Sequence, residues 1–161
     1  TGMIVSTRES AECRKCLLEL GVSQVSGGSK TSVGGYFQPM PEKEDSAQFD
    51  VSDRRPLDEV IKWLMELGYL PSFCTACYRN GRTGDRFMEI CKDKQIHNFC
   101  HPNAILTLKE YLEDYASLKT KAIGEVLIEN EQKNLECSEC VKLKVVEDLK
   151  KIENGGRDFN F

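Results

Sequence analysis

The first 26 residues predict a strand, a helix and a second strand parallel to the first, and this unit constrains the fold more than any other feature of the sequence. Residues 3–6 form a short apolar run, and residues 22–26 alternate between apolar and polar side chains as a half-buried strand does. Between them, Ser10 is a good N-cap and Gly21 is a good stop for a helix. Two parallel strands need further strands beside them, because an isolated pair leaves exposed edges and an uncovered face.

No such strand follows in the sequence after residue 50. Residues 27–56 contain several glycines and prolines and are expected to form a long loop, and residues 69–101 are expected to form a second loop that carries cysteines. Apolar residues at helical spacing predict the remaining elements, which are helices at about 57–67, 102–116, 118–131 and 138–153. The sequence therefore predicts an α/β chain, with the tail of a larger βα fold over residues 1–50 and a mainly α-helical part over residues 51–161.

Composition excludes several classes of protein. Apolar residues make up 40% and charged residues 30% of the 161 positions, as in a folded globular protein. The net charge of −4 argues against a nucleic-acid partner held by a broad basic surface. No apolar run reaches the roughly 18 residues of a membrane helix and no export signal is seen, so we expect a cytoplasmic protein with no membrane partner. The start at Thr1-Gly2-Met3 suggests a piece of a longer chain or a processed product.

Eight cysteines in a chain without an export signal favour metal binding over disulfide bonds. Three pairs have the spacing Cys-x2-Cys, and the first of these is Cys13 with Cys16. These two share an apolar helix stripe with Leu17 and Leu20, so we expect them to be buried as small hydrophobic side chains.

The last pair, Cys137 and Cys140, lies beside Glu136 and Glu139, whose negative charge disfavours thiolates. Zinc held by two such pairs is chemically possible, because zinc accepts four thiolates in a tetrahedron. However, Cys77 and Cys137 are 60 positions apart. The usual separation in zinc motifs is about 12 to 20 residues, so the spacing disfavours this arrangement.

The remaining pair, Cys74 and Cys77, forms the pattern Cys-x2-Cys-x22-Cys with Cys100. The segment around them carries more basic than acidic residues, and positive charge favours thiolates and the anionic cluster that thiolates hold. Three loop cysteines suit a four-iron cluster in which one iron has no protein thiolate, so that one coordination position stays open. Cys91 is the alternative fourth ligand and would close the site. A structural zinc-binding interaction module that uses all four cysteines is the competing interpretation.

Three stretches of the sequence resemble the C-terminal part of the HydG family, the radical S-adenosylmethionine tyrosine lyases of [FeFe]-hydrogenase maturation. They are Pro71 to Gly84 (PSFCTACYRNGRTG), Phe99 to Leu112 (FCHPNAILTLKEYL) and Arg157 to Phe161 (RDFNF). Residues 6–10 and 26–36 resemble the last strands of that family's (βα)8 TIM-type barrel. The resemblance implies that residues 1–50 are the last βαβ unit of the barrel with its following loop, and that residues 51–161 are a helical auxiliary-cluster domain.

The resemblance also implies an activity and its cofactors. The enzyme would cleave tyrosine, make carbon monoxide and cyanide from the fragment, and assemble an iron carbonyl cyanide unit for the hydrogenase H-cluster. Cys74, Cys77 and Cys100 would hold an auxiliary [4Fe-4S] cluster that supports an additional iron through free cysteine. S-adenosylmethionine and a second [4Fe-4S] cluster would belong to the complete enzyme of an anaerobic bacterium, together with the rest of the barrel and other hydrogenase maturation proteins as partners.

This chain departs from the family pattern in one important respect. The family's Cys-x3-Cys-x2-Cys loop, which binds the S-adenosylmethionine cluster, is absent from these residues, so this chain alone would not start the radical chemistry. Arg8 follows the first predicted strand, at the end where barrel active sites lie, and is expected to grip the carboxylate of tyrosine. His97 and His101 lie near Cys100 and are expected to support the site rather than to bind metal.

Overall fold

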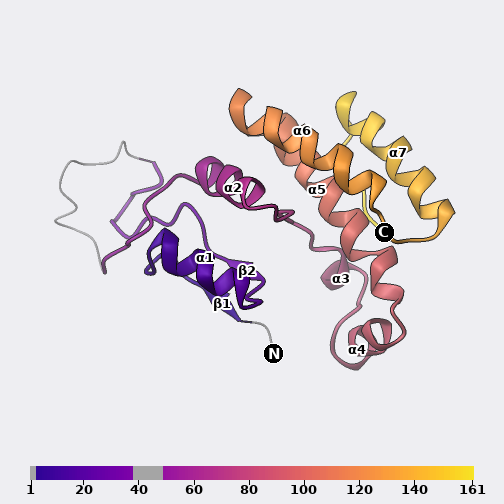
Figure 1. The fold of residues 1–161 in the computed structure, drawn as a ribbon, viewed down its shortest axis with the longest axis horizontal. Helices are drawn as coiled ribbons and strands as arrows, with labels where there is room; N and C mark the ends of the chain where they lie inside the picture. Colours follow the sequence, from indigo (N-terminus) through magenta and orange to yellow (C-terminus); the bar gives the residue numbers. More distant parts are fainter. Residues whose placement is uncertain (1–2, 38–48) are drawn as a thin grey trace. The chain divides into compact units, whose positions relative to one another are not determined.

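Two short parallel strands joined by a helix open the chain. In the computed structural model, which describes residues 3–37 and 49–161, β1 (Ile4–Val5) pairs with β2 (Gln24–Val25) and α1 (Ala11–Glu19) connects them (Figure 1). Ser10 caps α1 by accepting a hydrogen bond from the Cys13 backbone N–H at 3.2 Å. Gly21 ends the connection with a positive φ of 97°, a conformation that glycine adopts without strain. The predicted βαβ unit is confirmed, and the two strands alone do not establish a barrel.

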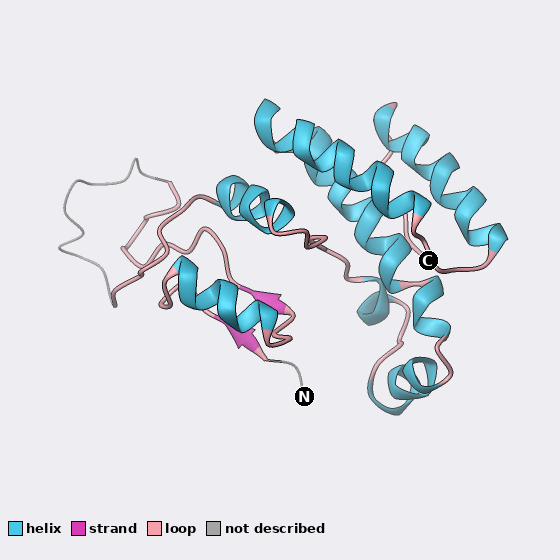
Figure 2. Cartoon of the chain, in the orientation of Figure 1, coloured by secondary structure: helices cyan, strands magenta, loops and turns pink. Residues whose placement is uncertain are grey.

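Helices form the rest of the described chain, and no strand follows β2 in residues 49–161 (Figure 2). The helices are α2 (Leu57–Glu66), α3 (Ala76–Arg79), α4 (Gly84–Lys92), the 3-10 helix η1 (Gln95–Asn98), α5 (Cys100–Asp114), α6 (Leu118–Lys133) and α7 (Glu139–Glu153). The four long helices that the sequence predicts are therefore present, with ends shifted by a few residues. In the described residues, no helix is long and apolar enough to cross a membrane.

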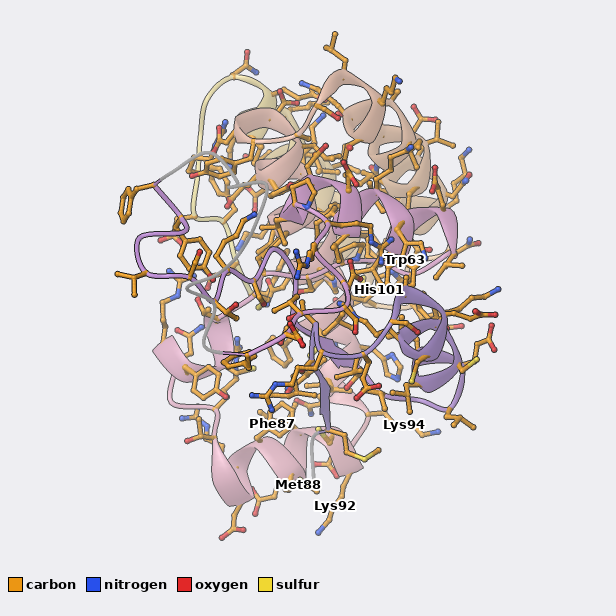
Figure 3. The ribbon with its side chains drawn as sticks, turned by 90° about the vertical axis from the view of Figure 1, so that its left-hand side faces the viewer. Trp63, Phe87, Met88, Lys92, Lys94 and His101 are labelled. Atoms are coloured by element: carbon orange, nitrogen blue, oxygen red, sulfur yellow. The ribbon has the colours of Figure 1, made fainter. Side chains whose placement is uncertain are left out.

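The segment 69–101 differs from the expected loop, because it forms α3, α4 and η1. Gly81 and Gly84 both have positive φ angles, and they separate α3 from α4. α4 has no buried residue, and Figure 3 shows Met88 and Lys92 at its outer edge. α3 and η1 have four residues each, too few to produce a helical period in the sequence. α4 has nine residues, with Phe87, Ile90 and Cys91 at helical spacing, so this helix was missed although its pattern is present.

Contacts divide the chain into two compact units, Thr1–Val60 and Ile61–Phe161. In the second unit, α5 packs against both α6 and α7. Ser117 caps α6 by accepting a hydrogen bond from the Thr120 N–H at 3.4 Å. The core of this unit contains buried apolar side chains from several helices, among them Met65, Ile105, Leu108, Leu112, Ile128, Val145 and Ile152. Residues of α2, α5, α6 and α7 supply this core, and Cys100 is the first residue of α5.

The first unit buries a different face of α1 from the one that the sequence predicts. The buried residues of α1 are Arg14 and Leu18, whereas Cys16 and Leu20 are exposed and Cys13 is half-buried. The expectation that this cysteine pair belongs to the core is therefore wrong. Apolar spacing alone cannot reveal that α1 turns a charged side chain inward, because the partner of that charge lies far along the sequence.

That partner is Asp53, whose side chain is buried together with that of Arg14. The Arg14 guanidinium donates to Asp53 Oδ2 and to the Ser26 carbonyl oxygen at the end of β2. Arg55 donates from Nε to Asp53 Oδ1 at 2.8 Å and from Nη2 to Asp53 Oδ2 at 2.6 Å. The Asp53 backbone N–H donates to the Thr7 carbonyl oxygen at 2.9 Å, just past the end of β1. This buried charge cluster ties α1 and both strand ends to the segment before α2.

We predict that Asp53→Asn destabilises the first unit by about 3–5 kcal/mol, because it removes the negative charge that compensates a buried guanidinium. A thermal or denaturant unfolding curve at pH 7 measures the loss. Glu19→Gln is the control, because Glu19 forms an exposed ion pair with Lys15 and its loss should change stability by less than about 1 kcal/mol. Equal stability of the two variants would contradict the structural role of Asp53.

The pH dependence of the same variant gives a second measurement. The hydrogen bonds from Arg55 lower the pKa of Asp53, and the charge of Arg14 acts in the same direction. A lowered carboxyl pKa stabilises the folded state above the unfolded pKa of about 3.9 and this stability is lost as the pH falls through the folded pKa. The difference between wild type and Asp53→Asn should therefore shrink as the pH falls below about 4.

Candidate metal centre

Four cysteines of the second unit lie on or beside short helices that precede α5. Cys74 lies two residues before α3, Cys77 lies within α3, Cys91 lies in the last turn of α4, and Cys100 is the first residue of α5. Cys74, Cys77 and Cys91 are half-buried, and Cys100 is exposed. All four thiols are therefore at least partly accessible to solvent.

The other three thiols influence the pKa of Cys100. The surrounding protein removes enough water from Cys100 to raise its pKa, although the side chain is exposed. The negative charges of Cys77, Cys74 and Cys91 raise the pKa further, in decreasing order of effect, and Arg82 lowers it. Because such influences fall with distance, Cys77, Cys74 and Cys91 lie near enough to Cys100 to affect its pKa, with the smallest effect from Cys91.

The net shift at Cys100 is opposite to the one that the basic composition of the segment predicts. Partial loss of water, followed by the influence of the other three thiols, outweighs the effect of Arg82. A metal group that binds Cys100 would replace its proton and supply positive charge in its place.

Two further observations bear on the kind of group that would fit. The Ala76 backbone N–H donates a hydrogen bond to Cys74 Sγ at 3.5 Å, as backbone amides do to the sulfurs of metal-bound cysteines. In the described residues, no group of three or more His, Cys, Asp or Glu side chains is arranged to hold a single metal ion. The donors suit an iron-sulfur cluster by their chemistry, because cysteine thiolates that hold such a cluster bind separate iron atoms.

Arg82 is a residue of this site that sequence reasoning did not single out. Its side chain is 8% exposed, and its guanidinium carbon lies 4.3 Å from the ring centroid of Phe99, the residue before Cys100. The Arg82 backbone N–H donates to the Cys77 carbonyl oxygen at 2.8 Å. In sequence, Arg82 is only one of several basic residues in the segment, and nothing local distinguishes it from the exposed Arg86.

The two histidines near Cys100 contact groups other than the four cysteines of this site. His101, labelled in Figure 3, lies 2.6 Å from Glu131 Oε2 through its Nε2 atom, so this nitrogen has a carboxylate partner on α6. His97 lines a cavity with Cys137 and Ser138. These contacts agree with the expectation that the histidines support the fold. Cys140, the partner of Cys137 in the last cysteine pair, is exposed.

Arg8 belongs to the first unit and lies just past the end of β1. The side chain is exposed, and its guanidinium carbon lies 4.2 Å from the ring centroid of Phe49. Because β1 and β2 are parallel, Arg8 and the Gly27–Ser29 segment follow the carboxyl ends of the two strands at one edge of the sheet. Ligands of parallel α/β folds bind at this edge, so the position agrees with the expected role in substrate binding without testing it.

Comparison with known proteins identifies the relatives of this chain. Residues 1–70 match the Biotin and Thiamin Synthesis associated domain. The whole chain is similar to a solved structure described as "Crystal structure of HydG: A maturase of the [FeFe]-hydrogenase". The sequences are 52% identical, the TM-score is 0.90, and the match covers 100% of this chain and 34% of that one. No curated protein matches the chain.

The matched domain is found in radical S-adenosylmethionine enzymes, and it defines the class to which this chain is related. Within that class, the chain is homologous over its whole length to the C-terminal portion of HydG. The resemblance seen in the sequence motifs is thereby confirmed. The chain spans about a third of the length of the HydG chain that it matches.

Proposed function

We propose that this chain is the auxiliary-cluster portion of a radical S-adenosylmethionine enzyme that matures [FeFe]-hydrogenase. The observation that supports it most strongly is the similarity of the whole chain to a hydrogenase maturase, at 52% identity and a TM-score of 0.90. The spacing Cys-x2-Cys-x22-Cys of Cys74, Cys77 and Cys100 supplies three thiols to such a cluster. The pKa of Cys100 is raised in part by Cys77 and Cys74, in agreement with their proximity.

In this proposal, Cys74, Cys77 and Cys100 hold the cluster through their sulfur atoms. The Ala76 N–H donates a hydrogen bond to the Cys74 sulfur, and Arg82 supplies positive charge beside Cys100. Cys91 remains a free thiol. When bound, the cluster would supply an iron with an open coordination position, which can accept an additional iron carried by free cysteine.

The complete enzyme would convert tyrosine into p-cresol, carbon monoxide and cyanide and would release an iron carbonyl cyanide unit for the hydrogenase. The radical step needs S-adenosylmethionine and a second [4Fe-4S] cluster, whose Cys-x3-Cys-x2-Cys loop is not in this sequence. This portion would therefore act together with the rest of a barrel, and other hydrogenase maturation proteins would receive the product. Arg8 would orient tyrosine by donating two hydrogen bonds to its α-carboxylate.

A second candidate function uses Cys91 as a fourth ligand, because this thiol also influences the pKa of Cys100. The chain would then be a structural zinc-binding interaction module, and Cys91 would be as important as Cys100. The described side chains are not arranged around one ion as a tetrahedral zinc site needs, so we prefer the three-ligand cluster.

Anaerobic reconstitution with iron, sulfide and zinc in competition separates the two functions. We predict about four irons and inorganic sulfide per chain, with an electron paramagnetic resonance signal after reduction, because three thiolates and an open iron suit a cubane. Metal and sulfide analysis of the purified protein provides the measurement. One tightly bound zinc without sulfide would overturn the cluster and establish the structural module.

Cysteine variants test the ligand set. We predict that Cys100→Ser loses most of its iron, because two thiolates anchor a cluster poorly, whereas Cys91→Ser keeps the iron content and spectrum of wild type within about 20%. Cys140→Ser is the matched control, since Cys140 is exposed and outside the group that influences Cys100. Equal loss of iron in Cys91→Ser and Cys100→Ser would refute the open site.

The role of Arg8 can be tested in the complete enzyme. We predict that Arg8→Lys lowers kcat/KM for tyrosine by about tenfold or more, because an ammonium replaces the planar two-donor group at the carboxylate. Formation of p-cresol measures this step. Arg54→Lys is the control, because Arg54 is exposed in the same unit and donates from Nε to the Val51 carbonyl oxygen. Unchanged tyrosine kinetics in Arg8→Lys would remove this residue from the site.

A further inference from the structure

Arg82 is a buried cation that contacts three separate parts of the cysteine site. Its backbone N–H closes the turn after Cys77, with the Cys77 carbonyl oxygen at 2.8 Å. Its guanidinium lies over the Phe99 ring, which immediately precedes Cys100. Its Nη2 atom donates to the main-chain oxygen of Phe161. One side chain thus connects α3, the start of α5 and the last residues of the sequence.

Phe161 continues this connection to α5. Its backbone N–H donates to Asn103 Oδ1 at 2.9 Å, and Asn103 Nδ2 lies 3.5 Å from the same Phe161 oxygen that Arg82 contacts. Asn103 is 1% exposed and lies three residues after Cys100, which is about one helical turn. A chain of contacts therefore runs from the Cys77 turn through Arg82, Phe161 and Asn103 to the helix that carries Cys100.

The segment that ends in Phe161 is itself held in place by ion pairs. Arg157 donates from Nε to Asp114 Oδ2 at 2.8 Å, and Arg79 donates to Asp158 Oδ1 at 2.6 Å. The first pair ties the segment to α5 and the second ties it to α3. Several contacts thus fix the position of the Phe161 oxygen, which accepts the hydrogen bond from Arg82.

The guanidinium of Arg82 lies between two parts of the site. Its Nη2 atom donates to the Phe161 main-chain oxygen, and the group lies over the ring of Phe99, the residue before Cys100. Its Nε atom is buried and has no hydrogen-bond partner among the described residues. Thiolates that hold an iron-sulfur cluster at Cys100 would add negative charge beside this positive charge.

We propose that Arg82 is the positioning residue of the cluster site. It keeps the Cys77 turn and the Cys100 helix together through Phe99 and Phe161, and its buried positive charge stabilises the more negative, reduced form of the bound cluster. The inference rests on the proposed cluster function. In this inference, Arg82 influences both the rate at which the cluster loses iron and its reduction potential. A side chain with a purely structural role would not change the reduction potential.

The test compares Arg82→Gln and Arg82→Lys with the control Arg86→Gln, all reconstituted with iron and sulfide. Arg86 lies four residues further along, is exposed, and carries the same charge. Two quantities are measured: the midpoint potential of the cluster, by redox titration followed with electron paramagnetic resonance, and the rate of iron loss to an added chelator. Helical content by circular dichroism before reconstitution shows whether each variant folds.

We expect Arg82→Gln to have a more negative midpoint potential than wild type and to lose iron about tenfold faster or more, because charge and contacts are both removed. Arg82→Lys should retain most of the potential, since its charge remains, and should still lose iron faster, since an ammonium cannot cover Phe99 and reach Phe161 as the guanidinium does. Arg86→Gln should match wild type in both measurements.

The test separates failure of the proposed cluster function from failure of the role of Arg82. If the wild type acquires no cluster, the proposed function fails, and the role of Arg82 fails with it. If the wild type acquires a cluster and Arg82→Gln has the potential and iron-loss rate of Arg86→Gln, only the role of Arg82 is overturned. If Arg82→Gln does not fold, Arg82→Lys decides: a wild-type rate of iron loss in that variant would overturn the positioning role.

Discussion

Partial loss of water at the start of α5 is the constraint on which the cysteine site depends. It is the largest cause of the raised pKa of Cys100, and the charges of Cys77, Cys74 and Cys91 raise this pKa further. A thiol with a raised pKa keeps its proton, so a metal that binds Cys100 must displace that proton. The fold places the thiols on and beside short helices that precede α5, whose apolar residues lie in the core of the second unit.

The last residues of the sequence contribute to this placement. Arg157 and Asp158 form ion pairs with α5 and α3, respectively, and Phe161 bonds to the buried Asn103. A segment of five residues thus ties the helix that carries Cys77 to the helix that begins at Cys100. Without it, α3 has only four residues of its own, too few to be stable through its internal hydrogen bonds.

Short-range signals in the sequence predicted where several helices end, because a helix end depends on residues that are neighbours in the sequence. Gly21 and Gly68 end helical stretches with positive φ, as the sequence predicts. The ligand set that the cysteine spacing indicates stays a prediction. The inward position of Arg14 was missed because Asp53 lies 39 positions away, and the exposure of Cys16 follows from it.

The contribution of Arg82 was missed for the same kind of reason. Its acceptor, Phe161, lies 79 positions further along the chain. A spacing rule within one helix or one loop cannot detect such a pair, and composition records only another basic residue. The ligands of the site could be proposed from the sequence, whereas the residue that holds them in relation to one another could not.

The two buried arginines of this chain show how structural and ligand-binding charges differ. Arg14 faces the carboxylate of Asp53, so its charge is neutralised within the first unit. Arg82 donates instead to the main-chain oxygen of Phe161 and lies over the ring of Phe99, the residue before Cys100. Arg14 thus neutralises a carboxylate inside one unit, whereas Arg82 joins two segments that meet at the cysteine site. A neutral side chain of similar size at position 82 would lose both contacts of the guanidinium, and it would also remove positive charge from the place where thiolates gain negative charge when they bind metal.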